Sequence, residues 1–187
     1  MEFKDIKKIH QGKFIARYDL TYVTTDNVEK VYEMISRNKN LEKFEDLSSH
    51  GADAVVMIMH SMDGEKILLN KEFRLPAGAW VYNFPAGLIE PGESVEVAAA
   101  RELKEETGLT LGEITDVLGE SFSAIGFSNE KNVCIVGKAY GNFEKSTSTF
   151  EEIQAAWYNK EEVASLLDSE YFAGRTQAYC YLWSHQN

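Results

Sequence analysis

Six glutamates crowd the segment from Gly87 to Leu109, where only two residues, Arg101 and Lys104, are basic. The glutamates are Glu90, Glu93, Glu96, Glu102, Glu105 and Glu106. Neighbouring carboxylates repel one another, so each ionised group makes the next harder to ionise. A chain that gathers them builds either a solvated acidic surface or a binding site for a cation. Carboxylate oxygens suit hard cations, which favours Mg²⁺ or Mn²⁺.

Helical periodicity bears on the choice between these two readings. At 100° per residue, Glu102 and Glu106 lie about 40° apart, and Glu105 lies about 60° to the other side of Glu102. The apolar residues on the same stripe are Val95, Ala98 and Ala99. The acids therefore continue an apolar stripe, which favours a cation site. Other apolar residues of this helix, among them Leu103, point elsewhere, so an acidic surface patch stays open as the alternative.

The elements that must position this segment form a strand-rich pattern with few helices. The expected strands are residues 12–23, 27–38, 52–60, 67–75, 80–84, 115–122, 132–140 and 153–159. The expected helices are residues 94–107, 160–167 and 171–183. Asp63-Gly64 predicts a hairpin turn between two of the strands. Ser94 can cap the glutamate helix and Gly108 can end it.

Charge is unevenly distributed along the 187 residues. Residues 1–48 hold nine basic and nine acidic residues, whereas residues 49–187 hold ten basic and twenty-one acidic ones, so the net charge of −11 belongs to the second part. Such an acidic protein repels DNA and RNA, so no nucleic-acid partner is expected. It can still bind a small phosphorylated molecule if a divalent cation supplies positive charge.

Cysteine content and the N-terminus bear on the compartment. Cys134 and Cys180 lie among apolar neighbours, which is typical of buried thiols in a reducing compartment. No apolar run approaches the roughly 20 residues of a membrane span. The N-terminal residues are too charged for a signal peptide. A cytoplasmic protein without a membrane partner is expected.

The spacing of the segment resembles the Nudix hydrolase signature, G-x5-E-x7-R-E-U-x-E-E-x-G-U, where U is a bulky aliphatic residue. Gly87, Glu93 and the run 101–109, RELKEETGL, match every specified position. The resemblance implies an α/β (α+β) fold, a Nudix-type α/β/α sandwich with a mixed sheet. It also implies cleavage of a diphosphate that links a nucleoside to another group. The expected division is a small antiparallel β element at 1–48 and a Nudix hydrolase domain at 49–187.

The same resemblance implies roles for individual residues. Metal ligands for Mg²⁺, with Mn²⁺ as a possible substitute, would come from Ala86 (through its carbonyl), Glu93, Glu102, Glu105 and Glu106. Arg101 would orient the glutamates through a salt bridge. A carboxylate then accepts the proton of the attacking water, and either Glu106 or the loop residue Glu130 could do so.

Flanking residues resemble the ADP-ribose pyrophosphatase branch, which implies further site residues. In FRLPAGAWVYNFPAGLIEPGE, Arg74 would contact phosphate, and in SAIGFSNEKNV, Glu130 would be the general base. An N-terminal sheet in that branch exchanges across a homodimer, where Tyr18 and Tyr22 could stack on adenine. Each of these residues also has a structural interpretation. Arg74 could be a solvated arginine on a strand, and Glu130 could be a solvated loop carboxylate. Tyr18 and Tyr22 could simply pack within the sheet.

The sequence is therefore compatible with three functions. The first is Mg²⁺-dependent hydrolysis of ADP-ribose or a related nucleoside diphosphate sugar to a nucleoside monophosphate and a sugar phosphate. The second is hydrolysis of another nucleotide, such as a dinucleoside polyphosphate or a damaged nucleoside triphosphate. Ile125 favours this second reading, because the ADP-ribose branch usually has a proline there; Asn83 also departs from the branch, where many members have glutamate. The third is a nucleotide-sugar sensor without turnover.

Overall fold

The computed structural model describes residues 1–147 and 152–186. The chain forms two compact units. The first comprises Met1–Asp53 and Glu120–Asn132, and the second comprises Ala54–Gly119 and Val133–Asn187. The expected division at residue 48 stays a prediction. Within the described part of the chain, no helix has the length and apolar character needed to cross a membrane.

The first unit is built on a three-stranded antiparallel sheet in the order β1-β2-β3. Its elements are β1 (Glu2–Gln11), β2 (Ala16–Val23), β3 (Glu29–Ser36) and the short 3₁₀ helix η1 (Phe44–Leu47). Alternate residues of β2 are buried, and with side chains from β3 and the following loop they form a small core. This core consists of Ala16, Tyr18, Leu20, Met34 and Leu41.

The second unit is built on a seven-stranded mixed sheet in the order β10-β5-β4-β9-β8, with β6 added beside β5 and β7 beside β4. Its strands are β4 (Ala54–His60), β5 (Ile67–Arg74), β6 (Ala79–Asn83), β7 (Ala86–Leu88), β8 (Thr110–Phe122), β9 (Lys131–Tyr140) and β10 (Ile153–Tyr158). The β4–β5 hairpin turns at Gly64, whose φ of 81° is a conformation that glycine adopts without strain.

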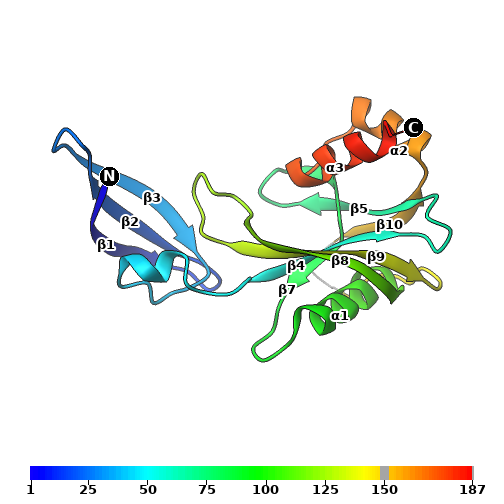
Figure 1. The fold of residues 1–187 in the computed structure, drawn as a ribbon, viewed down its shortest axis with the longest axis horizontal. Coiled ribbons are helices and arrows are strands. Elements are labelled where there is room, and N and C mark those ends of the chain that lie inside the picture. The colour runs from blue at the N-terminus through cyan, green and yellow to red at the C-terminus, as the bar shows by residue number, and fades with distance from the viewer. Residues whose placement is uncertain (148–151, 187) are drawn as a thin grey trace. The chain divides into compact units, whose positions relative to one another are not determined.

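Helices cover both faces of this sheet, as Figure 1 shows. The helix α1 (Val95–Thr107) lies on one face, and α2 (Lys160–Ser169) and α3 (Gly174–Ser184) lie on the other. Each face has its own core. Leu68 of β5 packs with the α1 residues Ala98, Ala99 and Leu103, while Ile67 packs with the side chains of α2 and α3. Side chains alternate along a strand, so successive β5 residues belong to opposite faces.

Local signals explain where α1 begins and ends. The Ser94 side chain accepts a hydrogen bond from the Val97 backbone N–H, and Gly108 closes the helix in the left-handed conformation with φ of 80°. The predicted helix over 94–107 is confirmed. Leu103, which the sequence placed off the Ala98–Ala99 stripe, is buried in the same core as those residues, because the buried arc of α1 is wider than the stripe.

Several element boundaries differ from the sequence prediction. The strand β1 and the three-residue strand β7 were not expected, β8 begins at Thr110 instead of 115, and α3 begins at Gly174 instead of 171. Every β1 residue is exposed or partly exposed, so β1 lacks the apolar alternation that identifies a half-buried strand. The strand β7 is short, and its pairing with β4 defines it.

Candidate active site

Arg101 is the centre of the glutamate cluster on α1. Its Nε and Nη2 donate to the two carboxylate oxygens of Glu93, each at 2.9 Å, and its Nη1 donates to Glu102 at 2.8 Å. Nη2 also donates to the carbonyl oxygen of Leu88 at 2.9 Å. One guanidinium therefore fastens the loop that precedes α1 to the helix, in the two-pronged geometry that arginine forms with carboxylates.

The electrostatics of this cluster favour ionised carboxylates. The hydrogen bonds from Arg101 lower the pKa of Glu93, helped by the backbone N–H of Glu90, and the Glu93 and Glu102 carboxylates raise the pKa of Arg101. Glu105 is half-exposed and reaches Arg101 only at 3.5 Å. The signature has four glutamates, Glu106 included, and a single arginine. The cluster therefore keeps a net negative charge, as a cation site requires.

Glu102 lies against the backbone of Gly87. A Cβ atom at position 87 would stand 1.9 Å from the carboxyl carbon of Glu102, so only glycine allows this approach. The side chain of Glu102 is 16% exposed. Gly87 thus makes room for a half-buried carboxylate beside β7, the strand that carries the carbonyl of Ala86.

Glu106, one helical turn further, has a different partner. The side-chain Nδ2 of Asn70 donates to Glu106 Oε2 at 2.8 Å. Asn70 lies on β5 and is only 2% exposed. Asn70 was not among the expected site residues, although Asn70, Glu72 and Arg74 follow one another at the two-residue period of a single strand face.

Arg74 continues this polar row on β5. Its Nη1 donates to Glu72 at 3.2 Å, and Asn83 of the paired strand β6 donates to the other Glu72 oxygen at 3.0 Å. The hydroxyl of Thr176 on α3 in turn donates to Asn83 at 2.9 Å. Glu72 is buried while half of the Arg74 side chain is exposed. A buried carboxylate therefore anchors an arginine whose other side faces solvent.

The residues of the cluster fit a hard divalent cation by their chemistry. All candidate donors are oxygens, and Glu102 and Glu106 project from the same half-buried side of α1. Within residues 1–147 and 152–186, no three His, Cys, Asp or Glu side chains stand together closely enough to hold a metal ion. Arg101 draws Glu93 and Glu102 towards itself, so a cation would share Glu102 with this arginine.

The other sequence-predicted residues lie in the first unit. Glu130 accepts a hydrogen bond from Nε of Arg37, and its backbone carbonyl accepts one from Ser123. Tyr18 is fully buried, with its hydroxyl donating to the Asn38 carbonyl at 3.0 Å, as in ordinary sheet packing. Tyr22 is only partly buried and packs edge-on against Phe3. The catalytic and stacking roles of these residues stay predictions, and the burial of Tyr18 argues against stacking by that ring.

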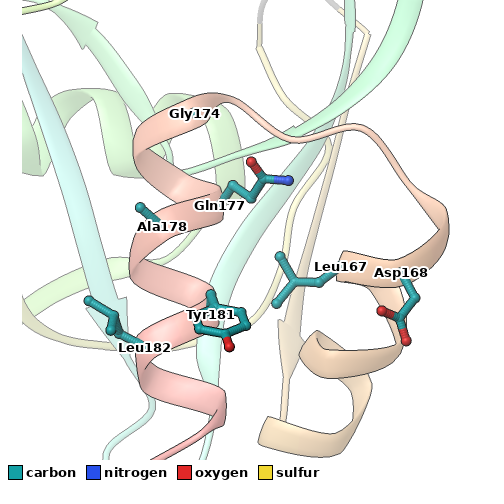
Figure 2. Close-up of a pocket in the computed structure, with 7 residues that line it drawn as sticks. All are labelled: Leu167, Asp168, Gly174, Gln177, Ala178, Tyr181 and Leu182. Atoms are coloured by element: carbon teal, nitrogen blue, oxygen red, sulfur yellow. The ribbon is translucent and has the colours of Figure 1, made fainter.

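A groove between α2 and α3 is a separate feature of the second unit. It has a volume of about 590 Å³ and is shown in Figure 2. Its lining residues are Leu167, Asp168, Gly174, Gln177, Ala178, Tyr181 and Leu182. Only one carboxylate lines it, and it lies on the face of the sheet opposite α1. The groove therefore lacks the groups from which the glutamate site is built.

The family to which the chain belongs is shown by comparison with known proteins. A family model described as the NUDIX domain matches residues 50–179, which is most of the chain. The protein belongs to the Nudix hydrolase family, whose members generally use a divalent metal. The matched range contains α1, Gly87 of β7 and the polar row on β5.

Individual relatives extend this result. The chain is 31% identical over 175 residues to the ADP-ribose pyrophosphatase of Saccharomyces cerevisiae, covering 91% of this chain and 67% of that protein. It is 34% identical over 108 residues to the ADP-sugar pyrophosphatase of Mus musculus, covering 58% of this chain and 47% of that one, so it spans about half of the mouse protein's length.

A solved structure shares the fold. The crystal structure of an ADP compounds hydrolase superposes with a TM-score of 0.71, covering 97% of this chain and 91% of the other, at 18% sequence identity. At this identity the likeness concerns the fold alone. The expected Nudix-type α/β/α sandwich with an additional small antiparallel sheet is confirmed.

Proposed function

We propose that this protein hydrolyses the diphosphate bond of ADP-ribose, or of a closely related nucleoside diphosphate sugar, with Mg²⁺ as cofactor. The observation that carries the proposal is the glutamate cluster, in which Arg101 binds Glu93 and Glu102 and Asn70 binds Glu106. The names of the yeast and mouse relatives support the substrate class. The products would be AMP and ribose 5-phosphate.

Glu102 and Glu106 would hold the cation, with Glu105 close behind, Glu93 acting through a water and the Ala86 carbonyl completing the site. A cation bound there supplies charge neutralisation of the diphosphate and acidifies a water molecule. Arg101 would orient Glu102 through the salt bridge between them. Mn²⁺ could replace Mg²⁺, because both prefer oxygen ligands.

Two further side chains would complete the reaction. Arg74 would bind a phosphate oxygen, because its guanidinium is half-exposed and its other side is held by Glu72. Glu130 would accept the proton of the attacking water, with Glu106 as the alternative base. As the water oxygen bonds to phosphorus, the bridging P–O bond breaks and the released phosphate carries away the bond's electron pair.

We also propose a cytoplasmic homodimer that uses the β1-β2-β3 sheet. The exposed side chains of this sheet include Ile9, Val31 and Tyr32, which a second copy could cover. Tyr22 would then lie near the adenine of the substrate. Sedimentation or light scattering at micromolar concentration tests the dimer, and removal of residues 1–36 should give a monomer if the sheet forms the interface.

Product analysis by chromatography tests the proposed reaction. The protein is incubated with Mg²⁺ and, in parallel, with ADP-ribose, ADP-glucose, UDP-glucose, NADH, diadenosine polyphosphates and 8-oxo-dGTP, each with an EDTA control. Release of AMP from ADP-ribose well ahead of the rest is the expected result. Faster turnover of a dinucleoside polyphosphate would show that the protein is a hydrolase with a different substrate class. Tight binding of ADP-ribose without turnover of any compound would contradict the proposal and indicate a sensor.

A further inference from the structure

The row of polar side chains on β5 begins with Asn70, a residue buried where an apolar one would be expected. Its neighbour two positions earlier, Leu68, belongs to the apolar core beneath α1, and its cross-strand neighbour on β10 is Ala155, which packs against the same core. Asn70 is 2% exposed. Burying a carboxamide in such surroundings is unfavourable unless its polar atoms make hydrogen bonds.

Only one of the two polar atoms in the Asn70 side chain makes a hydrogen bond among the described residues. Nδ2 donates to Glu106 at 2.8 Å, while Oδ1 is buried and has no hydrogen-bond partner among the residues that the structure describes. An unsatisfied buried acceptor is destabilising. A leucine at this position would avoid that cost and suit the core better. The stability of the fold therefore does not account for Asn70, whereas its contact with Glu106 does.

Asn70, which binds Glu106, differs in charge from Arg101, which binds Glu93 and Glu102. Arg101 binds Glu93 and Glu102 with a full positive charge, which competes with any cation for those carboxylates. Asn70 is neutral, so its hydrogen bond fixes the direction of the Glu106 carboxylate without neutralising it. The Asn70 amide therefore holds the Glu106 side chain in one orientation and adds no charge that competes with a cation.

We propose that Asn70 is a positioning residue that acts through Glu106 and sets the affinity of the site for a divalent cation. This inference rests on the proposed function of the glutamate cluster. Residues that orient metal ligands from behind typically change metal affinity or activity by roughly 10- to 100-fold when they are replaced. The buried Oδ1 lies on the same amide and can accept a hydrogen bond from a water of the site.

Mn²⁺ binding by calorimetry, without substrate, tests this role separately from turnover. Asn70→Leu should weaken Mn²⁺ binding by roughly 10-fold or more relative to the unchanged protein. Thr107→Val is the matched control: Thr107 is buried on α1, and its hydroxyl donates to the Leu103 carbonyl and accepts from the Leu109 backbone N–H. It should lower the melting temperature and leave the dissociation constant for Mn²⁺ unchanged.

A double-mutant cycle decides whether Asn70 acts through Glu106. In a Glu106→Gln background, the added Asn70→Leu change should alter Mn²⁺ binding less than twofold, because the carboxylate it positions is gone. Equal weakening in both backgrounds would overturn the proposal, as would unchanged binding in Asn70→Leu alone. If Asn70→Leu does not fold, Asn70→Ala serves in the same cycle. Failure of the proposed function has a different signature, since Glu106→Gln would then leave Mn²⁺ binding unaltered.

Discussion

The two faces of the large sheet use the same strands for different purposes. On β5, the side chains towards α1 include Asn70, Glu72 and Arg74, and all three make polar contacts. Other side chains of β5 lie on the opposite face. There Ile67 lies in an apolar core with residues of α2 and α3, and Lys71 stands 5.2 Å from the ring centroid of Tyr82.

The opposite face shows what a purely structural side of this fold looks like. Its core includes stacked aromatic rings, such as Tyr82 and Phe172 with centroids 5.3 Å apart, and burial raises the pKa of the Cys180 thiol to about 12. That thiol stays neutral and unreactive at physiological pH. A buried polar side chain such as Asn70, with an unsatisfied oxygen, is less stabilising than an apolar one, so its presence on the α1 face points to a functional role.

Removing a ligand of the α1 face should have the largest effect. We expect Glu102→Gln to lower kcat at saturating Mg²⁺ by about 100-fold or more, because the bound metal contributes several kcal/mol of transition-state stabilisation. Glu96→Gln is the matched control, since Glu96 lies on the same helix and is exposed. Steady-state kinetics of both variants measure the contrast, and equal losses would mean that Glu102 acts only as one more surface charge.

Loss of the ion pair between Glu72 and Arg74 on β5 should have a smaller effect on catalysis. Glu72→Gln keeps the shape of the side chain but removes the charge that holds Arg74, so we expect KM to rise about tenfold, equivalent to ~1.4 kcal/mol, with little change in kcat. Lys71→Gln changes the charge of the next residue along the strand, on the opposite face. It should leave KM unaltered, and a similar rise in both variants would remove the distinction between the faces.

A mutation in the core between the sheet and α2 and α3 should change the free energy of unfolding but leave kcat unchanged. Ile67→Val removes one buried methylene from the α2–α3 core and should lower the free energy of unfolding by about 0.5–1.5 kcal/mol. Chemical denaturation measures this change, and kcat is measured on the same preparation. A fall in kcat at a temperature where the variant is fully folded would show that packing beneath α2 and α3 affects catalysis at the active site.

Lowering the pH should reduce the stability of the folded protein through protonation of Glu93. Its pKa is lowered in the folded protein by the hydrogen bonds from Arg101, so the stabilisation is fully present above its ordinary pKa of about 4.5 and is lost as the pH falls through the lower, folded value. The melting temperature of Glu93→Gln should therefore lie below that of the unchanged protein at pH 7, and the difference should shrink by pH 3. A constant difference would contradict this linkage.

Much of the α1 side could be predicted from the sequence because its signals are local. Ser94 and Gly108 mark the ends of the helix, and the spacing from Gly87 to Glu106 specifies which carboxylates share a side of it. The hairpin turn at Asp63-Gly64 is local as well. These features depend on residues within a few turns of one another, so the backbone geometry of a single element determines them.

The parts that the sequence could not supply depend on contacts between distant residues. Asn70 and Glu106 are 36 positions apart, and the link from Thr176 to Asn83 joins residues 93 positions apart. The alternation of Asn70, Glu72 and Arg74 was a usable signal, since it predicts one polar strand face. Nothing local indicated that this face lies against the glutamates, because strand order decides it.

The most direct test of the account follows ADP-ribose by ³¹P NMR with the unchanged protein and Mg²⁺ in ¹⁸O-labelled water. The account predicts that the diphosphate signals are replaced by those of AMP and ribose 5-phosphate, that one of these two products carries a single ¹⁸O, and that EDTA stops the reaction. Persistence of the diphosphate signals, or equal turnover in EDTA, would contradict the assignment of the α1 face as a metal-dependent diphosphate hydrolase.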